Sequence, residues 1–368
     1  IKDFKRILVS SLEVLHQSLV DTTSKLKVLE KSKLVDAGAK GFVFFMEGII
    51  DFIKSNNIRK IVSLSNENIS LIHSDDTSNE DINFRYCTEA LLRDLSLNKS
   101  DIQKLLIENG DSVVVAGSDS LCRIHVHTNH PAALFNTLKS YGTITYQKVD
   151  DMVRQNEYVK HRKWNIALVT DSACDLSQEL IDYYQINMLP LNINLDGNYY
   201  LDKVTMQPDQ LYDLLDSSDE LPKTSQINER TFTNLYSQLA SHYDAIIALH
   251  LTQQFSGTYL NSLKAAERIK SEFNKPVYVI DSKNLSGALG LLVLKIAKAI
   301  EEEMPIQDIV KSAEEWIKNL KIFVSVKDLK YMIKGGRVSK NKAFLATLLG
   351  INPIVSMDSE GNAMLFGK

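Results

Sequence analysis

The stretch AIIALHLTQQFSGT, residues 245–258, decides the fold. Its first seven residues form a short, almost wholly apolar run, as expected of a strand that is buried on both faces of a sheet. Ser256 and Gly257 then open a helix. A buried strand that passes through a loop into a helix is the repeating step of a parallel α/β sheet, where ligands bind beyond the carboxyl ends of the strands.

The same step recurs from residue 164 to the end of the chain. It predicts the fold class: α/β, with a mostly parallel sheet covered by helices on both faces. The expected strands are 165–170, 186–193, 245–251, 277–280 and 322–326, with a further strand near 362–366, and the expected helices are 177–184, 229–241, 257–272, 285–302 and 306–320.

A different pattern precedes this domain. Residues 83–149 predict a β-α-β-β-α-β order, which is the ferredoxin-like arrangement. The strands are expected at 83–92, 111–117, 121–127 and 143–149, and the helices at 99–109 and 131–141. The polar stretch 73–81 before them contains nothing to bury and is expected to be a linker.

The N-terminal residues predict two helices, one amphipathic over 4–20 and one apolar nearly all round that begins near Asp36. Two helices are too few for a domain, so we expect the tail of a helical bundle. The expected domains are therefore 1–72, 73–160 and 164–368. Because the chain begins with Ile and its last strand reads as cut off before a partner, we expect a fragment of a longer polypeptide.

Composition excludes several classes of function. Lys and Arg number 42 against 46 Asp and Glu, which gives a net charge of -4 and argues against a nucleic-acid partner. The three cysteines are odd in number and scattered, which favours a reducing, cytoplasmic compartment over a disulfide framework. No apolar stretch reaches membrane-spanning length. A small molecule or a protein is the expected partner, and the sequence leaves the oligomeric state open.

Three hydroxyl-rich segments lie where a strand or loop gives way to a helix: 170–172, 224–226 and 255–258. Such segments offer hydroxyls and helix-end amides to one carboxylate or phosphate. Each alone has an alternative interpretation as an ordinary helix N-cap. A nucleophilic Ser256 is less favoured, because the segment is not a G-x-S-x-G elbow and His250 lies in the apolar strand. The candidate anion ligands are Asp171, Ser172, Thr224, Ser225, Ser256 and Gly257.

A second candidate site is a metal centre. His125 and His127 alternate along one expected strand and so share a face, and Cys87 lies on another strand of the same small sheet. Two His and one Cys form a set that binds zinc and leaves a fourth position open. Asp111, Asp119 or Glu89 could complete the shell, and the sequence does not choose among them.

A basic glycine turn, residues 334–339, is too short for a P-loop. The favoured interpretation is a helix C-cap with Gly at the left-handed position. The alternative places Arg337 on the surface as a docking or phosphate-facing cation.

At these motifs the chain resembles two families that act together. Residues 164–368 resemble the DegV family of fatty-acid-binding proteins, and residues 1–160 resemble the end of a dihydroxyacetone-kinase-like domain followed by the middle and C-terminal parts of a fatty acid kinase subunit. The first resemblance rests on TDSACDL (170–176), KTSQ (223–226), SGTY (256–259) and GGRVS (335–339), and the second on VDAG (35–38), FRYCTE (84–89) and HVHTNHP (125–131).

The resemblance implies that the C-terminal domain buries a long-chain fatty acid and fixes its carboxylate with Thr224 and Ser256. It implies that a kinase domain, in cis or in trans, transfers the γ-phosphate of ATP to that carboxylate and forms an acyl-phosphate. Only Asp36 and Gly38 match the nucleotide-contacting end of the kinase family, whose magnesium-binding aspartates would lie upstream of Ile1. This chain alone is therefore not expected to be a kinase, with ATP and Mg²⁺ bound only by the missing part.

For the middle domain, the resemblance implies that Cys87, His125 and His127 are metal ligands, with zinc as the candidate ion. Two competing hypotheses remain beside the lipid carrier. One is a metal-dependent hydrolase centred on these three residues. The other is a non-catalytic interaction scaffold that docks through Arg337.

Overall fold

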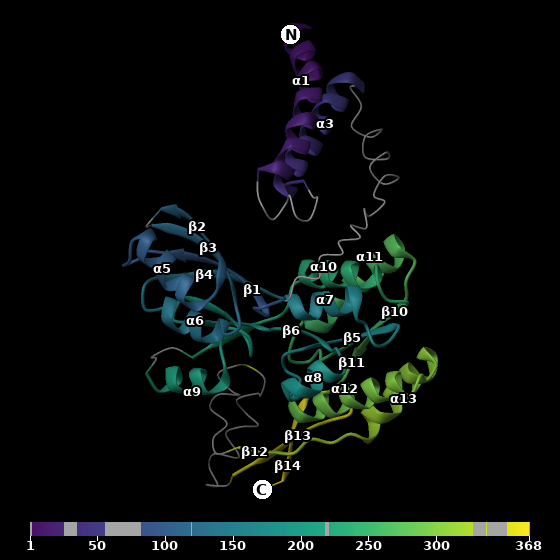
Figure 1. The fold of residues 1–368 in the computed structure, drawn as a ribbon. Helices are drawn as coiled ribbons and strands as arrows, with labels where there is room; N and C mark the ends of the chain where they lie inside the picture. The colour runs from purple at the N-terminus through teal and green to yellow at the C-terminus, as the bar shows by residue number, and fades with distance from the viewer. Residues whose placement is uncertain are drawn as a thin grey trace. The chain divides into compact units, whose positions relative to one another are not determined.

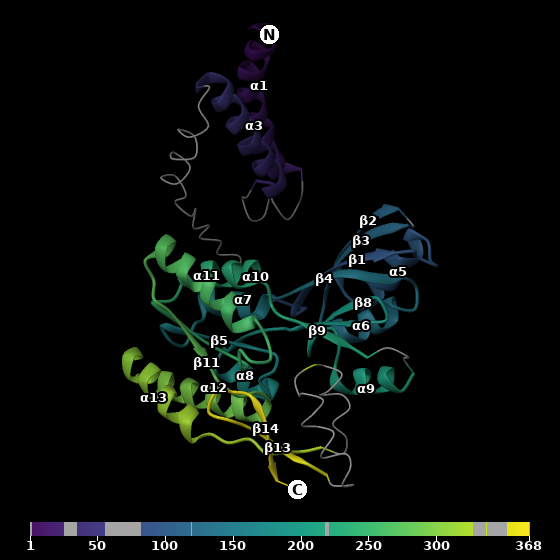
Figure 2. The same cartoon turned by 180° about the vertical axis from the view of Figure 1, so that it is seen from behind.

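The computed structural model describes residues 2–25, 35–55, 82–118, 120–217, 221–326, 336 and 352–367 (Figures 1 and 2). They form two compact units, Ile1–Asp81 and Ile82–Lys368, and each is described by itself. The expected linker 73–81 and Arg337 lie outside the described residues. None of the helices in the described part of the chain has the length and apolar content needed to cross a membrane.

The N-terminal unit is a pair of helices, α1 (Lys2–Asp21) and α3 (Ala37–Ser55), with the short 3-10 helix η1 (Thr22–Ser24) after α1. Val43 and Ile50 lie two turns apart on one face of α3 and are buried. Phe42, Phe44 and Phe45 of the same helix are exposed. The helix is thus apolar on both its covered and its uncovered sides, as the sequence predicts.

The middle domain has the predicted ferredoxin-like fold. Its sheet order is β2-β3-β1-β4, and every neighbouring pair is antiparallel. The elements are β1 (Tyr86–Arg93), α5 (Lys99–Asn109), β2 (Asp111–Ser118), β3 (Leu121–Thr128), α6 (Pro131–Leu138) and β4 (Thr143–Asp151). Alternation along β1 and β3 sends Ala90, Leu92 and Ile124 into a core with α5 and α6, and leaves Cys87 and His125 on the opposite face of the sheet.

The C-terminal domain has a four-stranded parallel sheet of order β11-β10-β5-β6, which confirms the predicted α/β class. Its strands are β5 (Ile166–Asp171), β6 (Asn187–Leu189), β10 (Ala245–His250) and β11 (Val277–Asp281). Ile247 and Leu249 of β10 pack into one core, and Ile246 and Ala248 pack into another. Every residue of β10 is buried, because helices cover both faces.

Helices from separate parts of the chain make the two layers. The first core is formed with α8 (Gln178–Tyr183), α12 (Ser286–Glu301) and α13 (Ile306–Asn319). The second is formed with α7 (Met152–Lys160), α10 (Glu229–Ala240) and α11 (Thr258–Phe273). Figure 1 shows these two groups of helices on opposite sides of the sheet.

The predicted strands of the parallel sheet were wrong in two regions. The expected strand 322–326 is reduced to Val324–Ser325, which lies in a separate antiparallel sheet. The expected strand 186–193 divides between two sheets, because Pro190 has no backbone N–H and interrupts it. The second part is β7 (Asn192–Leu195), which joins β8 (Asn198–Leu201) and β9 (Lys223–Ser225) in a sheet of order β8-β7-β9. The hairpin turns at Asp196 and Gly197, which both have positive φ, and α9 (Pro208–Ser217) follows it.

A second three-stranded sheet contains β12 (Val324–Ser325), β13 (Ile354–Met357) and β14 (Ala363–Gly367). The expectation that the last strand has no partner is wrong, since β14 pairs antiparallel with β13. Thr252 of the β10–α11 loop donates a hydrogen bond of 2.9 Å to the carbonyl of Gly361, so this hairpin reaches the carboxyl end of β10.

Candidate functional site

Two of the three hydroxyl-rich segments meet in the structure. The side chain of Gln226 lies against Gly257, where a Cβ would come within 1.9 Å of the Gln226 Oε1 atom. The next residue, Ile227, donates its amide to Thr258 Oγ1 at 3.4 Å. Asn261 Nδ2 donates to the Ile227 carbonyl at 2.8 Å. Gly257 is therefore required by close contact, and it lets the 224–226 segment approach the start of α11.

Ser256 precedes Gly257, the N-cap residue of this helix. Its hydroxyl accepts from the amide of Thr258 at 3.3 Å and lies 2.8 Å from Thr258 Oγ1. Ser256 remains partly exposed, as do Thr224 and Ser225 of β9. The hydroxyl thus lies, partly exposed, beside the first amide of the helix, at the helix end where partial positive charge favours an anion.

The third hydroxyl-rich segment, 170–172, makes structural contacts inside the protein. Asp171 is buried, and its Oδ2 accepts from the amide of Leu251 at 2.9 Å, while its Oδ1 accepts from the amide of Ala173 at 3.0 Å. Ser172 donates to Asp202 and accepts from the amide of Leu191 at 2.9 Å. Both side chains hold loops together inside the protein, so the structure does not place them beside Thr224, Ser225 and Ser256 at the surface.

A chain of four fully buried side chains continues inward from Asp171. His250 Nδ1 lies 3.1 Å from Asp171 Oδ2, and His250 Nε2 lies 2.8 Å from Ser262 Oγ. Ser262 Oγ lies 2.6 Å from the hydroxyl of Tyr236, and burial raises the pKa of Tyr236. A proton on His250 Nδ1 gives each of these four side chains a hydrogen-bond partner.

Ser262, His250 and Asp171 are hydrogen-bonded one to the next in the same order as the serine, histidine and aspartate of a hydrolytic triad. All three side chains have zero exposure, however, so the serine cannot reach a substrate. This position agrees with the expectation of a packed, satisfied His250. Sequence reasoning missed Ser262 and Tyr236, because each sits in an ordinary helix with no motif around it.

The candidate metal ligands come together on the face of the middle-domain sheet that carries Cys87. Strand register sets Cys87 opposite His127, and the ligand atoms of Cys87, His125 and His127 all lie within 4.8 Å of one another. Cys87 Sγ is 3.9 Å from His125 Nδ1. A tetrahedral zinc ion with ordinary Zn–S and Zn–N bonds places these two atoms about 3.6 Å apart, so the Cys87–His125 pair is close to the spacing that the ion needs.

The structure separates the three candidates for a fourth zinc ligand by their positions and partners. Asp111 Oδ1 lies 3.3 Å from His127 Nδ1, where it can orient that ring. Glu89 is paired with Arg123, and Asp119 lies outside the described residues. Burial and the neighbouring His127 lower the pKa of His125, which keeps its imidazole neutral and available as a ligand.

The Asp36 carboxylate has a structural role at the start of α3. Its Oδ1 accepts from the amide of Ala39 at 2.6 Å, which is the contact of an N-cap. Its own amide donates to Thr22 Oγ1 at 2.8 Å, so it also ties α3 to the turn after α1. A Cβ at Gly38 would lie 3.2 Å from the carboxylate. Nucleotide contact by Asp36 and Gly38 stays a prediction.

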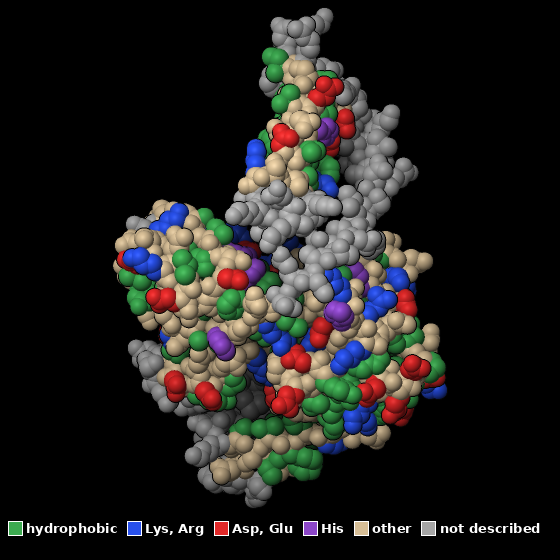
Figure 3. Space-filling view, in the orientation of Figure 1, with side chains coloured by type: hydrophobic (Ala, Val, Ile, Leu, Met, Phe, Trp, Pro, Cys, Tyr) green, Lys and Arg blue, Asp and Glu red, His purple; other side chains and the backbone are tan. Residues whose placement is uncertain are grey.

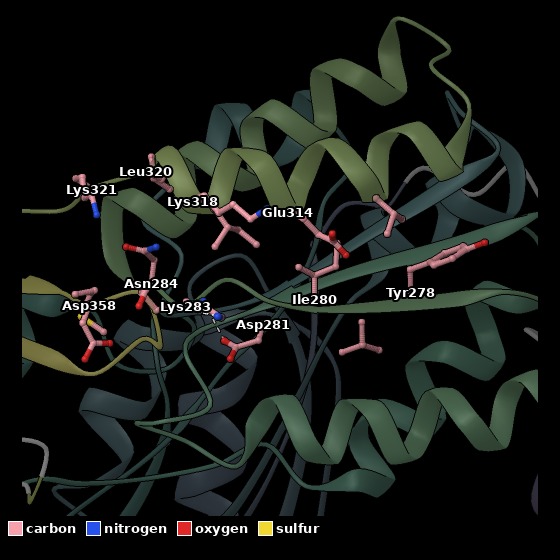
Figure 4. Close-up of a pocket in the computed structure, with 15 residues that line it drawn as sticks. Tyr278, Ile280, Asp281, Lys283, Asn284, Glu314, Lys318, Leu320, Lys321 and Asp358 are labelled. Atoms are coloured by element: carbon pink, nitrogen blue, oxygen red, sulfur yellow. Dashed lines mark hydrogen bonds between the residues drawn. The ribbon is translucent and has the colours of Figure 1, made fainter.

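Two cavities lie elsewhere in the larger unit. One, of about 520 Å³, is bounded by β11, α13 and the β13–β14 turn, with Asp281, Asn284 and Lys318 on its wall (Figure 4). The other, of about 590 Å³, lies between α6 and the segment 203–210. Neither cavity is lined by Thr224 or Ser256. On the face seen in Figure 3, acidic and basic side chains are mixed among the described residues, which gives no basic stripe for nucleic acid.

Comparison with known proteins agrees with this arrangement. Residues 165–368, more than half of the chain, match the family described as "Uncharacterised protein, DegV family". The chain belongs to the DegV family. Its residues 83–159 match a second family, described as the middle domain of proteins like a fatty acid kinase subunit, so a DegV domain follows a region similar to that middle domain in one polypeptide.

Individual relatives support the DegV assignment. A DegV domain-containing protein of Clostridium perfringens is 34% identical over 198 residues, which cover 54% of this chain and 70% of that protein. The fatty-acid-binding DegV protein of Thermus thermophilus is 30% identical with a TM-score of 0.51 over 55% of this chain and 71% of its own. DegV of Bacillus subtilis, a fatty-acid-binding protein, is 32% identical with a TM-score of 0.51, over 56% and 72%.

The buried network predicts a stability difference. Asp171→Ala leaves three donors without an acceptor in the interior, so we expect a loss of about 3 kcal/mol or more. Tyr236→Phe removes one terminal hydroxyl and should cost about 1 kcal/mol. Urea denaturation of both variants measures the difference. If Asp171→Ala were as stable as the unmodified protein but failed to hold a ligand, Asp171 would be a ligand contact instead of a structural one.

Proposed function

We propose that the DegV domain binds a long-chain fatty acid by its carboxylate. The single observation that supports this most is the contact of Gln226 with Gly257 and of Ile227 with Thr258, which brings the end of β9 to the start of α11. The hydroxyl residues on either side of this contact, Thr224, Ser225 and Ser256, are exposed or partly exposed. The solved DegV proteins of Thermus thermophilus and Bacillus subtilis are fatty-acid-binding proteins with this fold.

The chemistry of these groups suits a carboxylate. Hydroxyls and helix-end amides donate charge-assisted hydrogen bonds that replace the water around the anion. A carboxylate so held stays ionised without a full counter-charge. The acyl tail contributes about 0.8 kcal/mol per buried methylene, so the tail supplies most of the affinity and the hydroxyls fix the orientation of the headgroup.

We further propose that the bound acid is presented to an ATP-dependent kinase domain, in cis or in trans. A carboxylate oxygen would attack the γ-phosphorus, the bond to the β-phosphate oxygen would break, and ADP would leave beside an acyl-phosphate. The covalent link to a kinase-subunit middle domain supports this proposal. A tether of this kind raises the effective concentration of the carrier at its kinase.

The first experiment compares lipid retention in two site variants. Thr224→Ala and Ser256→Ala should each weaken binding of oleate by about tenfold or more, because each removes a hydrogen bond to a charged group. Native mass spectrometry of the purified chain measures the bound acyl mass, and titration with oleate gives the dissociation constant.

Thr233→Ala and Ser271→Ala are matched controls, since both hydroxyls bond only to carbonyls of their own helices among the described contacts. These two variants should retain the acid. The proposal fails if the unmodified chain carries and takes up no fatty acid, or if the site variants and the controls bind it equally well.

The kinase step has its own test. An ATP-dependent dihydroxyacetone-kinase-like domain is added with Mg²⁺ to the oleate-loaded chain, and hydroxylamine traps any acyl-phosphate as a hydroxamate. We expect hydroxamate from the loaded chain and a loss of at least about tenfold with Ser256→Ala. Absence of hydroxamate from the loaded, unmodified chain with an active kinase domain would count against presentation while leaving fatty-acid binding intact.

We propose a second function for the middle domain, a zinc site formed by Cys87, His125 and His127. The observation that favours it is the approach of the three ligand atoms to within 4.8 Å, with Asp111 beside His127 as an orienting group. When bound, zinc would tie β1 to β3, and a solvent ligand in the fourth position could be activated for hydrolysis.

Metal content and thiol protection test this site together. The purified chain should hold about one zinc per molecule by elemental analysis, and zinc should shield Cys87 from alkylation. His125→Ala should lose both effects, whereas His161→Ala, a variant outside the cluster, should keep them. Turnover of a phosphate or carboxylic ester that depends on His125 would favour the hydrolase. Zinc binding without turnover would make the site structural.

A further inference from the structure

The middle domain and the DegV domain are joined edge to edge through two strands. β4 lies at the edge of the middle-domain sheet and β8 at the edge of the β8-β7-β9 sheet. The two edges do not form a ladder, and side chains bridge them instead. The Asn198 Oδ1 atom accepts from the amide of Ile144 at 2.8 Å. Figure 2 shows β8 and β9 next to β4.

Gln147 of β4 makes the second bridge and uses both ends of its amide. Its Nε2 donates to the carbonyl of Tyr199, and its Oε1 accepts from the hydroxyl of Thr205. Thr205 Oγ1 in turn accepts from the amide of Leu201 at 2.8 Å. One side chain of the middle domain therefore holds both the strand β8 and the turn that follows it.

An apolar core lies behind these bridges and is shared by both domains. Ile193, Leu195, Tyr200 and Met206 of the DegV domain pack into the same cluster as Ile144 of the middle domain. Each of these four side chains is no more than 4% exposed. Burial of this extent requires the middle domain to stay in contact with the hairpin.

Strand pairing connects this shared core to the proposed headgroup site. In β7, Ile193 pairs with Tyr200 of β8 on one side and with Thr224 of β9 on the other. β9 is three exposed residues long and lies at the edge of its sheet among the described strands, so β7 is the strand that holds it in place. A shift of β7–β8 would therefore displace β9 and Thr224 with it.

An ionic cluster fixes the two domains at a second point. Arg85, just before β1, pairs with Asp151 at 2.6 Å and with Asp182 of α8 at 2.6 Å. Arg154 of α7 is almost wholly buried and also pairs with Asp182, at 2.8 Å. With this cluster at one end and Gln147 at the other, the middle domain is held against the DegV domain at two separate places.

We propose that the middle domain forms a supporting wall of the fatty-acid site and that Gln147 is a positioning residue for Thr224. This inference rests on the proposed fatty-acid binding and adds a dependence of that binding on a neighbouring domain. Because binding linkage is reciprocal, occupation of the site by a fatty acid also tightens the β4–β8 junction. The domain next to the proposed kinase thereby senses whether the carrier is loaded.

The test uses the full chain with oleate as the probe. Gln147→Met keeps the size of the side chain but removes both bridges, so we expect the dissociation constant for oleate to rise about tenfold, the effect of losing an ordinary hydrogen bond. Hydrogen exchange should become faster at the amides of 223–225 in the absence of ligand. Gln147→Glu keeps the acceptor for Thr205 and should recover part of the affinity.

Two controls separate positioning from general stability. Tyr146→Ala changes the exposed neighbour on β4 and should leave binding unchanged. Ile309→Val weakens the separate buried core under α13 and should lower the melting temperature without changing the dissociation constant. If Gln147→Met does not fold, Asn198→Ser removes the other bridge and serves in its place.

The outcomes of the two proposals are distinguishable. Oleate affinity and exchange at 223–225 that stay as in the unmodified chain overturn the role of Gln147 while fatty-acid binding stands. An unmodified chain that binds no oleate overturns the proposed function. In that case exchange at 223–225 still decides whether Gln147 positions β9.

Discussion

The buried carboxylate of Asp171 is the constraint on which this architecture depends. It lies at the end of β5 and accepts the amide of Leu251 at the end of β10, so it joins the carboxyl ends of two neighbouring parallel strands. An ionised carboxylate is costly to bury unless several donors surround it, and here the amides of Leu251 and Ala173 and the ring of His250 do so. Because both strand ends are fixed, the loop from Thr252 to Gly257 starts α11 at a defined place, with Ser256 at the surface.

In this arrangement the side chain that fixes the backbone differs from the side chains that could contact a ligand. Asp171 would repel an anionic headgroup, and inside the protein it fixes the backbone instead. The neutral hydroxyls of Thr224, Ser225 and Ser256 remain outside, where donors to a carboxylate are needed. A carboxyl group whose oxygens are already hydrogen-bonded therefore lies in the interior, while neutral hydroxyls lie at the surface.

Sequence alone predicted the elements better than their contacts. The ferredoxin-like order and the parallel sheet follow from periodicity, because each strand has a clear apolar pattern and each helix a clear start. The β7–β8 hairpin was missed although Asp196-Gly197 is a turn signal for two-residue hairpins, since the apolar pattern before Pro190 runs on into Asn192–Leu195. The burial of Asp171 and Ser172 could not be read from their motif, because their partners His250, Leu191 and Asp202 are distant in sequence.

The middle domain and the DegV domain are joined by a packed contact and not only by the chain between them. A flexible tether would raise the local concentration of the carrier and nothing more. A shared core around Ile193 and Tyr200 does more, because those residues cannot stay buried unless the two domains keep one orientation. Thr224 is one strand away from that core, so the position of Thr224 and the docking of the middle domain are set by the same packing. In the proposed carrier, a ligand that draws β9 into place would also favour the docked arrangement, so the junction would link occupation of the site to the docking of the middle domain.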